Sequence, residues 1–359
     1  MLHKVSHPNS LVRIYAFSAF ATIATLIAVA YYGGAAALLT VLVLCALEIT
    51  FSFDNAVVNA KVLEKMPPFW QKAFLTVGIL IAVFGMRLVL PIVLVAATAN
   101  LGMGEVVRLA MEHPTEYAHH LEEAHPIIAS FGGIFLLMIF IEFILDYGRK
   151  VHWLSVLEAP LVKIGRIRQV APLIALIALA AVTHFLAGDH KFEVMSAGIL
   201  GLILYLGIRS LAEVFELKHQ SQMKKAGLDK KALMRMGAIN FLYLELLDAS
   251  FSFDGVIGAF AITNMVLLIA AGLGVGAVWV RSMTIHIVRR KTLMKYRYLD
   301  HGAHYAIGAL AAMLLLGMKY EIPEAVTGTI GIGIIAFAFY SSWRYNQKHR
   351  PPEAEKHRI

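Results

Sequence analysis

The sequence predicts an all-α membrane protein that crosses the bilayer about ten times, and three observations support this fold class. The 359 residues are 59% hydrophobic and only 16% charged, whereas soluble domains carry about 25% charged residues. The mean hydropathy is +0.69, and the apolar residues form stretches long enough to cross a hydrocarbon core of about 30 Å as helices. The polar connections between these stretches alternate in charge.

Ten stretches have the length of a membrane span, which is about 20 helical residues. In chain order they cover roughly residues 13–32, 36–60, 73–98, 126–147, 170–188, 194–216, 236–262, 265–288, 302–317 and 325–343. The first follows Lys4 and Arg13 and ends in small residues, as the apolar part of a signal peptide does. We interpret it as an uncleaved span, because the run from Tyr15 to Tyr32 is long for a signal peptide.

The charge of the connections tests the number of spans independently. Lys and Arg gather in every second connection, at 61–72, 149–168, 218–235, 289–297 and in the tail from 344. The others are acidic, neutral or very short, at 105–123, 189–193, 263–264 and 319–324. Because basic connections stay in the cytoplasm, we expect a multi-pass protein of the cell membrane, the inner membrane in a bacterium, with both termini cytoplasmic. The formal charge of +8 is therefore explained by topology and predicts no nucleic-acid partner.

A nine-residue motif occurs twice at an offset of 200 positions. Leu47 to Asn55 reads LEITFSFDN, and Leu247 to Gly255 reads LDASFSFDG. The copies lie on the second and seventh spans, an odd separation, so they would cross the membrane in opposite directions. We therefore predict two five-helix repeats of inverted topology, as in many secondary transporters. The predicted division is an N-terminal region with the first helix at 1–35, repeat halves at 36–188 and 189–343, and a basic cytoplasmic tail at 344–359.

Both copies place acids inside a span, where a carboxylate costs about 2.5–3.5 kcal/mol or more unless it is paired, hydrated or bound to a cation. Helical spacing puts Glu48, Ser52 and Asn55 on one face of the second span. The matching face of the seventh span holds Glu245, Asp248, Ser252 and Gly255. Asp54 and Asp254 fall about 100° off these faces in a regular helix. The polar Ser-x-Asp step in each copy would permit a local unwinding that turns them inward.

Carboxylate, hydroxyl and carbonyl oxygens without thiols suit hard divalent cations such as Mg²⁺, Ca²⁺ or Mn²⁺. We predict that such a metal ion is the substrate, held by Glu48, Asp54, Asn55, Glu245, Asp248 and Asp254. Supporting roles are expected for Ser52, Ser252, Arg87, Arg281 and Glu142. The two arginines, each on the span after its motif, would provide counter-charges when no ion is bound. Two alternatives stay open: simple acid–arginine ion pairs between helices, and a proton relay through the same carboxylates.

The two motifs also resemble those of a known family. An acid followed by Ser-x-Asp-Asn-Ala at 48–56, and Glu-x-x-Asp-x-x-x-Ser-x-Asp at 245–254, resemble the TerC family of integral membrane proteins. Three further stretches are similar to a poorly characterised branch of that superfamily, at 84–87, 279–284 and 298–304. TerC-like proteins are associated with manganese export, metal homeostasis and tellurite resistance, so the resemblance implies manganese efflux. Gly255 departs from the family pattern, in which a Ser usually follows the second Asp.

Two polar regions outside the motifs remain open to more than one interpretation. The connection at 105–125 is rich in His and Glu and would either bind a transition metal or form a solvated acidic loop. Near the end of the fourth span, Glu142 is a candidate for the ion path, while Asp146 is expected to pair with Arg149 and Lys150.

No phosphate-binding loop or catalytic triad is present in the sequence, which argues against an enzyme and against ATP as the energy source. Transport would then be driven by an ion or proton gradient. The competing hypothesis is a non-transporting membrane factor that supports metal or tellurite resistance or the assembly of other membrane proteins.

Overall fold

The structure is a computed structural model that describes residues 9–167, 169–185, 187–226, 230–260, 262–320 and 322–349. Within these ranges, the side chains at 9–11, 13, 212–213, 215–232, 252–254, 293–294 and 324–325 are not described. The predicted site residues Ser252 and Asp254 therefore lie outside the described side chains. The described chain is helical and contains no strand, which confirms the predicted all-α class.

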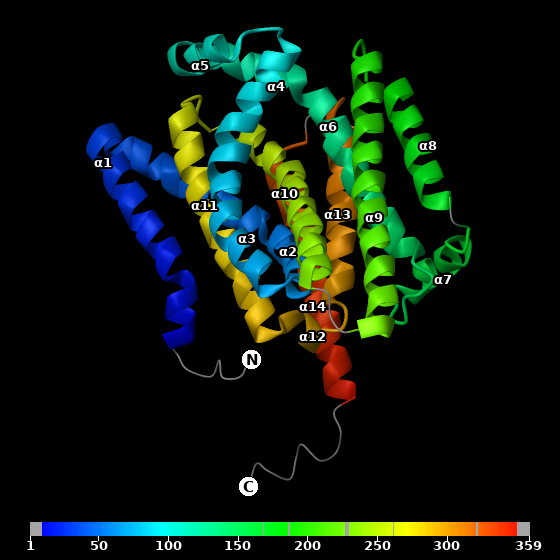
Figure 1. Ribbon diagram of the computed structural model, residues 1–359. Helices are drawn as coiled ribbons and strands as arrows, with labels where there is room; N and C mark the ends of the chain where they lie inside the picture. Colours follow the sequence, from blue (N-terminus) through cyan, green and yellow to red (C-terminus); the bar gives the residue numbers. More distant parts are fainter. Residues whose placement is uncertain are drawn as a thin grey trace.

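The helices form a bundle in which most of them run side by side (Figure 1). In chain order they are α1 (Asn9–Phe51), α2 (Phe53–Glu64), α3 (Pro68–Leu80), the π-helix η1 (Ile81–Val89), α4 (Leu90–Thr98), α5 (Met103–Glu112), α6 (Pro114–Leu145), α7 (Ser155–Ile164), α8 (Val170–Phe185), α9 (Lys191–Ala226), α10 (Lys230–Phe260), α11 (Val266–Arg290), α12 (Thr292–Lys295), α13 (Leu299–Gly317) and α14 (Glu324–Lys348). Figure 1 shows α5 lying across one end of the bundle, with α7 and α12 at the opposite end.

Seven helical segments of the described chain are long and apolar enough to cross a membrane. They are Ile14–Phe51, Pro68–Thr98, Pro114–Leu145, Lys191–Leu211, Val266–Arg290, Leu299–Gly317 and Val326–Lys348. The sequence predicts ten spans, and the difference arises at three places. The first two predicted spans are joined within α1, α8 has only 16 residues, and α10 carries Glu245 and Asp248 in its middle. The seven segments indicate a multi-pass membrane protein.

A glycine produces the bend that makes α1 a helix of two arms. Gly34 has φ 72° and ψ −169°, a left-handed region that side-chain-bearing residues rarely adopt. Figure 1 shows the two arms meeting at an angle. The first arm contacts α11, where the hydroxyls of Ser18 and Ser282 lie 2.7 Å apart and Tyr15 Oη lies 3.0 Å from His286 Nδ1.

The first copy of the motif interrupts a helix, whereas the second does not. α1 ends at Phe51 and α2 begins at Phe53, because Ser52 has φ −94° and ψ 16° and leaves the helical region. This break is the local unwinding that the sequence predicts for the first copy. In the second copy, α10 continues from Lys230 to Phe260 without a break, so the corresponding prediction there is wrong.

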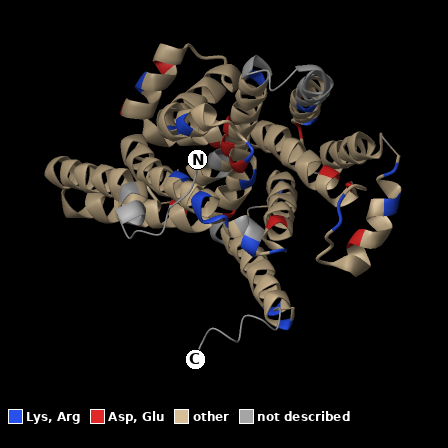
Figure 2. Cartoon of the chain, turned by 60° about the horizontal axis from the view of Figure 1, so that its bottom comes forward, with Lys and Arg blue, Asp and Glu red and all other residues tan. Residues whose placement is uncertain are grey.

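The end of the bundle that holds α7, α12 and the last turn of α2 is called here the basic end. Lys61 lies in that last turn, Lys163 in the last turn of α7 and Lys295 in that of α12. Figure 2, in which this end comes forward, shows Lys and Arg spread around it. The clustering agrees with the charge alternation seen in the sequence.

Candidate functional site

Six charged side chains are buried together where the motif helices meet their neighbours. They are Glu48, Asp54, Arg87, Glu245, Asp248 and Arg281, and each is at most 7% exposed. All six were predicted as site or supporting residues from the sequence. A buried charge is costly unless it is paired, so the partners of each one define what the site can do.

Glu48 is neutralised by Arg87 within the first half of the chain. The Arg87 guanidinium forms an ion pair with Glu48 through Nη2, and its Nη1 donates to the carbonyl oxygen of Ala82 at 2.6 Å. Ser52 at the helix break also donates to Glu48 Oε1, at 3.0 Å. Arg87 lies in the π-helix η1, and such wide turns are frequent at functional sites.

Glu245 and Asp248 share one arginine within the second half. Arg281 Nη2 lies 3.2 Å from Glu245 Oε2 and 3.2 Å from Asp248 Oδ2. Its Nη1 donates to the carbonyl oxygen of Phe74 at 2.9 Å, and the guanidinium lies 4.1 Å from the centre of the Phe74 ring. Two carboxylates therefore face a single cation, so this group keeps a formal negative charge when both acids are ionised.

Each ion-paired group packs against a glycine from the other half of the chain. A Cβ at Gly276 of α11 would lie 2.5 Å from both Cβ and Cγ of Glu48. A Cβ at Gly78 of α3 would lie 2.6 Å from Glu245 Oε1 and would also meet the Arg281 guanidinium. Only glycine leaves room for these approaches, and the two halves are thereby held in close contact at the buried charges.

Asn55 provides a direct hydrogen bond between the two motifs. Its Nδ2 donates to Asp248 Oδ1 at 2.9 Å, across 193 positions of sequence. Asn55 lines the same cavity as Glu48 and Ser52, and its amide also reaches α10. Asn55 Oδ1 is buried and accepts no hydrogen bond within the described chain.

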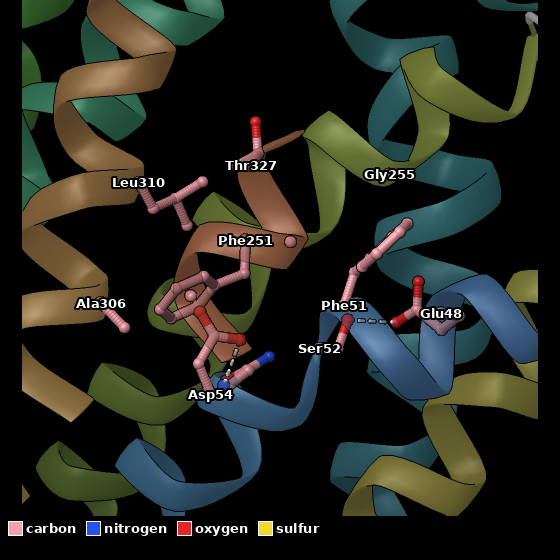
Figure 3. A pocket seen from close by; sticks show the side chains of 12 residues that line it. Glu48, Phe51, Ser52, Asp54, Phe251, Gly255, Ala306, Leu310 and Thr327 are labelled. Atoms are coloured by element: carbon pink, nitrogen blue, oxygen red, sulfur yellow. Dashed lines mark hydrogen bonds between the residues drawn. The ribbon is translucent and has the colours of Figure 1, made fainter. Parts of the chain in front are cut away.

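Asp54 differs from the other acids because no basic side chain of the described chain pairs with it. Its Oδ1 accepts a hydrogen bond from the backbone N–H of Asn55 at 2.8 Å, and it is 7% exposed. Figure 3 shows its carboxylate pointing toward Phe251, while Ser52 turns the other way, toward Glu48. Glu48 and Asp54, the two acids of the first motif, therefore have different hydrogen-bond partners.

Asp54 and Asn55 line a small cavity, called here the core cavity. Its volume is about 40 Å³, and a cavity of about 10–15 Å³ on this measure already holds one water. The other walls come from α1, α10, α13 and α14, namely Glu48, Phe51, Ser52, Phe251, Gly255, Ala306, Leu310, Thr327, Gly328 and Gly331. α14 approaches closely because of its glycines: a Cβ at Gly331 would lie 3.2 Å from Asp54 Oδ2. The cavity has room for a monatomic cation with one or two waters.

The predicted site residues are therefore only partly brought together. Glu48, Ser52 and Arg87 form one group, and Asn55, Asp248, Glu245 and Arg281 form another. Among the described side chains, no three His, Cys, Asp or Glu residues lie close enough to hold a metal ion. In this conformation three of the four described acids form the ion pairs that the sequence left open as the alternative, and Asp54 is the exception.

Glu142 lies in a different cavity from Asp54. It forms an ion pair with Arg209, and the Tyr205 hydroxyl donates to its Oε2 at 2.7 Å. Asp146 does not pair with Arg149 as predicted. Its Oδ1 instead accepts from the backbone N–H of Gly148 at 2.9 Å, because Arg149 is drawn to another acid.

That other acid, Glu158, is a fully buried residue that the sequence did not single out. Arg149 Nη2 lies 2.8 Å from its Oε2, and His152 Nδ1 lies 3.2 Å away. Burial alone raises the pKa of Glu158, but the backbone N–H of Leu154, Arg149 and nearby histidines outweigh it and hold the pKa below the usual glutamate value. The sequence does not indicate this burial, because Glu158 lies within the basic connection at 149–168, where an exposed acid is expected.

The His- and Glu-rich connection at 105–125 is not a loop. It consists of α5 and the first turns of α6, which begins at Pro114, a residue suited to the first turn of a helix. Within it, His119 and His120 lie 3.5 Å and 3.1 Å from Glu123. Among the described side chains, these residues do not form a group of three or more that could hold a metal ion.

The fold and the buried charges together define a multi-pass helical membrane protein with an acidic, arginine-paired centre. A family model described as a protein of unknown function, DUF475, matches residues 53–349. The chain belongs to this DUF475 family. The match begins at Phe53, so it contains Asp54, Asn55, the whole second motif and both buried arginines, whereas Glu48 and Ser52 lie before it. Comparisons with curated proteins and with solved structures gave no significant match.

Proposed function

We propose that this protein is a secondary transporter of divalent metal cations and that Asp54 is the centre of its cation site. The observation that supports this most strongly is the environment of Asp54. This buried carboxylate has no basic partner among the described side chains, and it lies beside an Asn55 amide oxygen that accepts no hydrogen bond from them, in a cavity large enough for a cation. Oxygen ligands of this kind suit hard cations. The resemblance of the motifs to TerC-like proteins favours manganese over Mg²⁺ or Ca²⁺, and favours efflux.

The charges around the core cavity support a divalent cargo. Four described acids face two arginines, so the group carries a formal charge of −2 when every acid is ionised, before Asp254 is counted. A divalent ion neutralises that charge. The arginines hold Glu48, Glu245 and Asp248 in place when no cation is bound. Asp54 and one charge of the Glu245–Asp248 pair then remain to be neutralised by protons or by the cation.

During transport, the bound metal ion would replace arginine as the partner of the buried acids. Asp54 is followed in the chain by Asn55, whose side chain donates a hydrogen bond to Asp248 of the other half. A cation bound at Asp54 would therefore lie near this connection. Drawing Glu48 or Asp248 away from its arginine toward the ion would change the contact between the halves. Protons that neutralise the same carboxylates provide the opposing flux, so the exchange is coupled to a proton gradient.

The proposed topology has ten spans in two inverted five-helix repeats, with both termini in the cytoplasm. Figure 1 shows α2 running toward the basic end and α10 running away from it, as expected for motif copies of opposite orientation. The two arms of α1 would be separate spans, and α8 and α10 would complete the count within the bundle. The basic end would face the cytoplasm.

Mn²⁺ uptake by proteoliposomes that contain the purified protein tests the proposal. Asp54→Asn keeps the size of the side chain and removes its charge, so we expect it to abolish gradient-driven Mn²⁺ uptake. Asp189→Asn is the matched control, because this exposed acid lies in the connection between α8 and α9 and should leave uptake unchanged. Equal uptake by wild type and Asp54→Asn would overturn the proposal. Absence of gradient-driven cation movement in the wild type would favour the non-transporting membrane factor instead.

A further inference from the structure

A second cavity lies closer to the basic end than the core cavity does. It has a volume of about 610 Å³, and its walls include the connections on either side of α7 as well as α6 and α9. Charged and hydroxyl side chains line it, among them Lys61, Glu142, Asp146, Tyr205 and Arg209. We call it the basic-end cavity.

Three helices, α2, α10 and α13, line both cavities. On α2 the core cavity is lined by Asn55 and the basic-end cavity by Lys61, which is six residues or about 9 Å further along the helix. On α10 the corresponding residues are Phe251 and Tyr243, which are about 12 Å apart. About two helical turns therefore separate the two cavities along α2 and α10, whereas on α13 the lining residues Ala306 and His304 are only two positions apart.

Asn59 lies on α2 between Asn55 and Lys61, at the level that separates the two cavities along this helix. Its neighbours on α2, Val57, Val58 and Ala60, are buried and apolar. Asn59 is only 1% exposed, yet its Oδ1 accepts no hydrogen bond within the described chain. A buried amide oxygen without a partner is uncommon in folded proteins, so it calls for an explanation.

The unpaired oxygens of Asn55 and Asn59 form a short series along α2. Residues four apart lie one above the other on a helix, so the two amides share one face and are separated by about 6 Å along the axis. Asn55 borders the core cavity, and Asn59 is one turn closer to the basic-end cavity. Neutral carbonyl oxygens of this kind are ligands for hard cations and bind them more weakly than carboxylates do.

We propose that Asn59 is a transit site through which the divalent cation passes between the basic-end cavity and Asp54. This proposal depends on the transport function proposed above and adds the route and a residue that contacts the cargo. The basic residues of the basic-end cavity do not repel the ion, because Lys61 is paired with Asp300 and Arg209 with Glu142. Asn59 would hold the ion during the step in which it has left one cavity and not yet reached the other.

Cysteine accessibility tests the route independently of transport. The chain contains one cysteine, Cys45, so Cys45→Ser provides a cysteine-free background for Asn59→Cys. Val58→Cys is the matched control, because it lies at the same depth on the same helix and is also buried. We expect a small cationic methanethiosulfonate reagent to modify position 59 much faster than position 58, and Mn²⁺ to slow that reaction. Equal rates at the two positions would overturn the route, and fast modification without Mn²⁺ protection would overturn the contact with the cation.

Flux measurements test the functional part of the proposal. Asn59→Leu keeps a similar volume and removes the oxygen, so we expect Mn²⁺ flux to fall by about tenfold or more while equilibrium Mn²⁺ binding at Asp54 is retained. Asn59→Asp should restore flux at least in part. Wild-type flux in Asn59→Leu would overturn the transit site, whereas wild-type flux in Asp54→Asn would overturn the transport site itself. The two failures are therefore distinguishable.

Discussion

The two copies of the motif share Phe-Ser-Phe-Asp but differ in structure. In the first copy the helix breaks at Ser52, and the following helix turns Asp54 into a cavity. In the second copy α10 continues unbroken, and Arg281 holds Glu245 and Asp248 of that helix. The arginine helices differ in the same way, since Arg87 lies in a π-helix and Arg281 in a regular α-helix.

This difference suggests a division of labour between the halves. In the irregular first half, the Asp54 carboxylate faces a cavity. In the regular second half, Glu245 and Asp248 both form ion pairs with the Arg281 guanidinium. Asn55 joins them through its hydrogen bond to Asp248. In a transporter of this kind, the cation would bind in the first half, and its binding would change the hydrogen bonds and ion pairs of Asp248 in the second half.

The largest effect expected from this comparison concerns the two arginines. Arg281→Ala leaves two buried acids without a cation and should lower the free energy of unfolding by about 3–5 kcal/mol. Arg87→Ala leaves only Glu48 unpaired and should cost less. Unfolding midpoints of the two variants in detergent micelles measure the difference. A lower midpoint for Arg87→Ala than for Arg281→Ala would contradict the division.

A second prediction concerns Glu158, which lies near the basic end and, unlike the central acids, is outside the motif region. Glu158→Gln should cost about 1.5–3 kcal/mol at neutral pH, because charged hydrogen bonds to Arg149 and the backbone are lost. The folded-state pKa of Glu158 is lowered, so its stabilisation is present above the ordinary glutamate pKa of about 4.3 and is lost as the pH falls through the lower folded-state value. Melting curves from pH 7 to pH 3 should therefore bring wild type and variant together at acid pH. A constant gap across this range would show that Glu158 does not stabilise the fold as a carboxylate.

A third prediction concerns the glycines that face the ion-paired groups. Gly276→Ala places a methyl group against Glu48, and Gly78→Ala places one against Glu245 and Arg281. Each should destabilise the fold by about 1–3 kcal/mol through overpacking. Gly333→Ala is the control, since nothing lies within 4 Å of a Cβ there. Thermal unfolding of the three purified variants is the measurement, and equal midpoints would rule out the close contact between halves.

The smallest effect is expected for two serines, Ser52 at the break in the first copy and Ser250 in the continuous helix of the second copy. Ser52→Ala removes a hydrogen bond to Glu48 and should cost about 0.5–1.5 kcal/mol. Ser250→Ala should cost less, because Ser250 Oγ donates only to the Leu246 carbonyl of its own helix. Denaturant unfolding of both variants in mixed micelles can separate the two values. If Ser250→Ala were the more costly change, the hydroxyl at the break would have no special role.

Much of the fold and part of the site could be predicted from the sequence. Composition and charge alternation predicted an all-helical membrane protein, and the spacing of Glu48, Glu245 and Asp248 identified the buried acids. The partner arginines were found because each lies on the span that follows its motif. These features depend on local sequence and on the high cost of charge in an apolar environment.

The remaining features depend on tertiary packing that the sequence does not reveal. The Phe-Ser-Phe-Asp shared by the two motifs gave no reason to expect a break in one copy and a continuous helix in the other. The core cavity owes its outer wall to Gly328 and Gly331 of α14, which is about 280 residues away from Asp54 in the chain. Asn59 looked like one polar residue within a mostly apolar run, and only its burial without a hydrogen-bond partner distinguishes it.

Equilibrium binding of Mn²⁺ to the purified protein tests the central claim most directly. The metal content after dialysis against increasing Mn²⁺ concentrations would be measured for wild type, Asp54→Asn and the control Asp189→Asn. The account predicts saturable binding to wild type and to the control, and its loss in Asp54→Asn. Saturable binding of unchanged affinity in Asp54→Asn would contradict the assignment of Asp54 as the centre of the cation site.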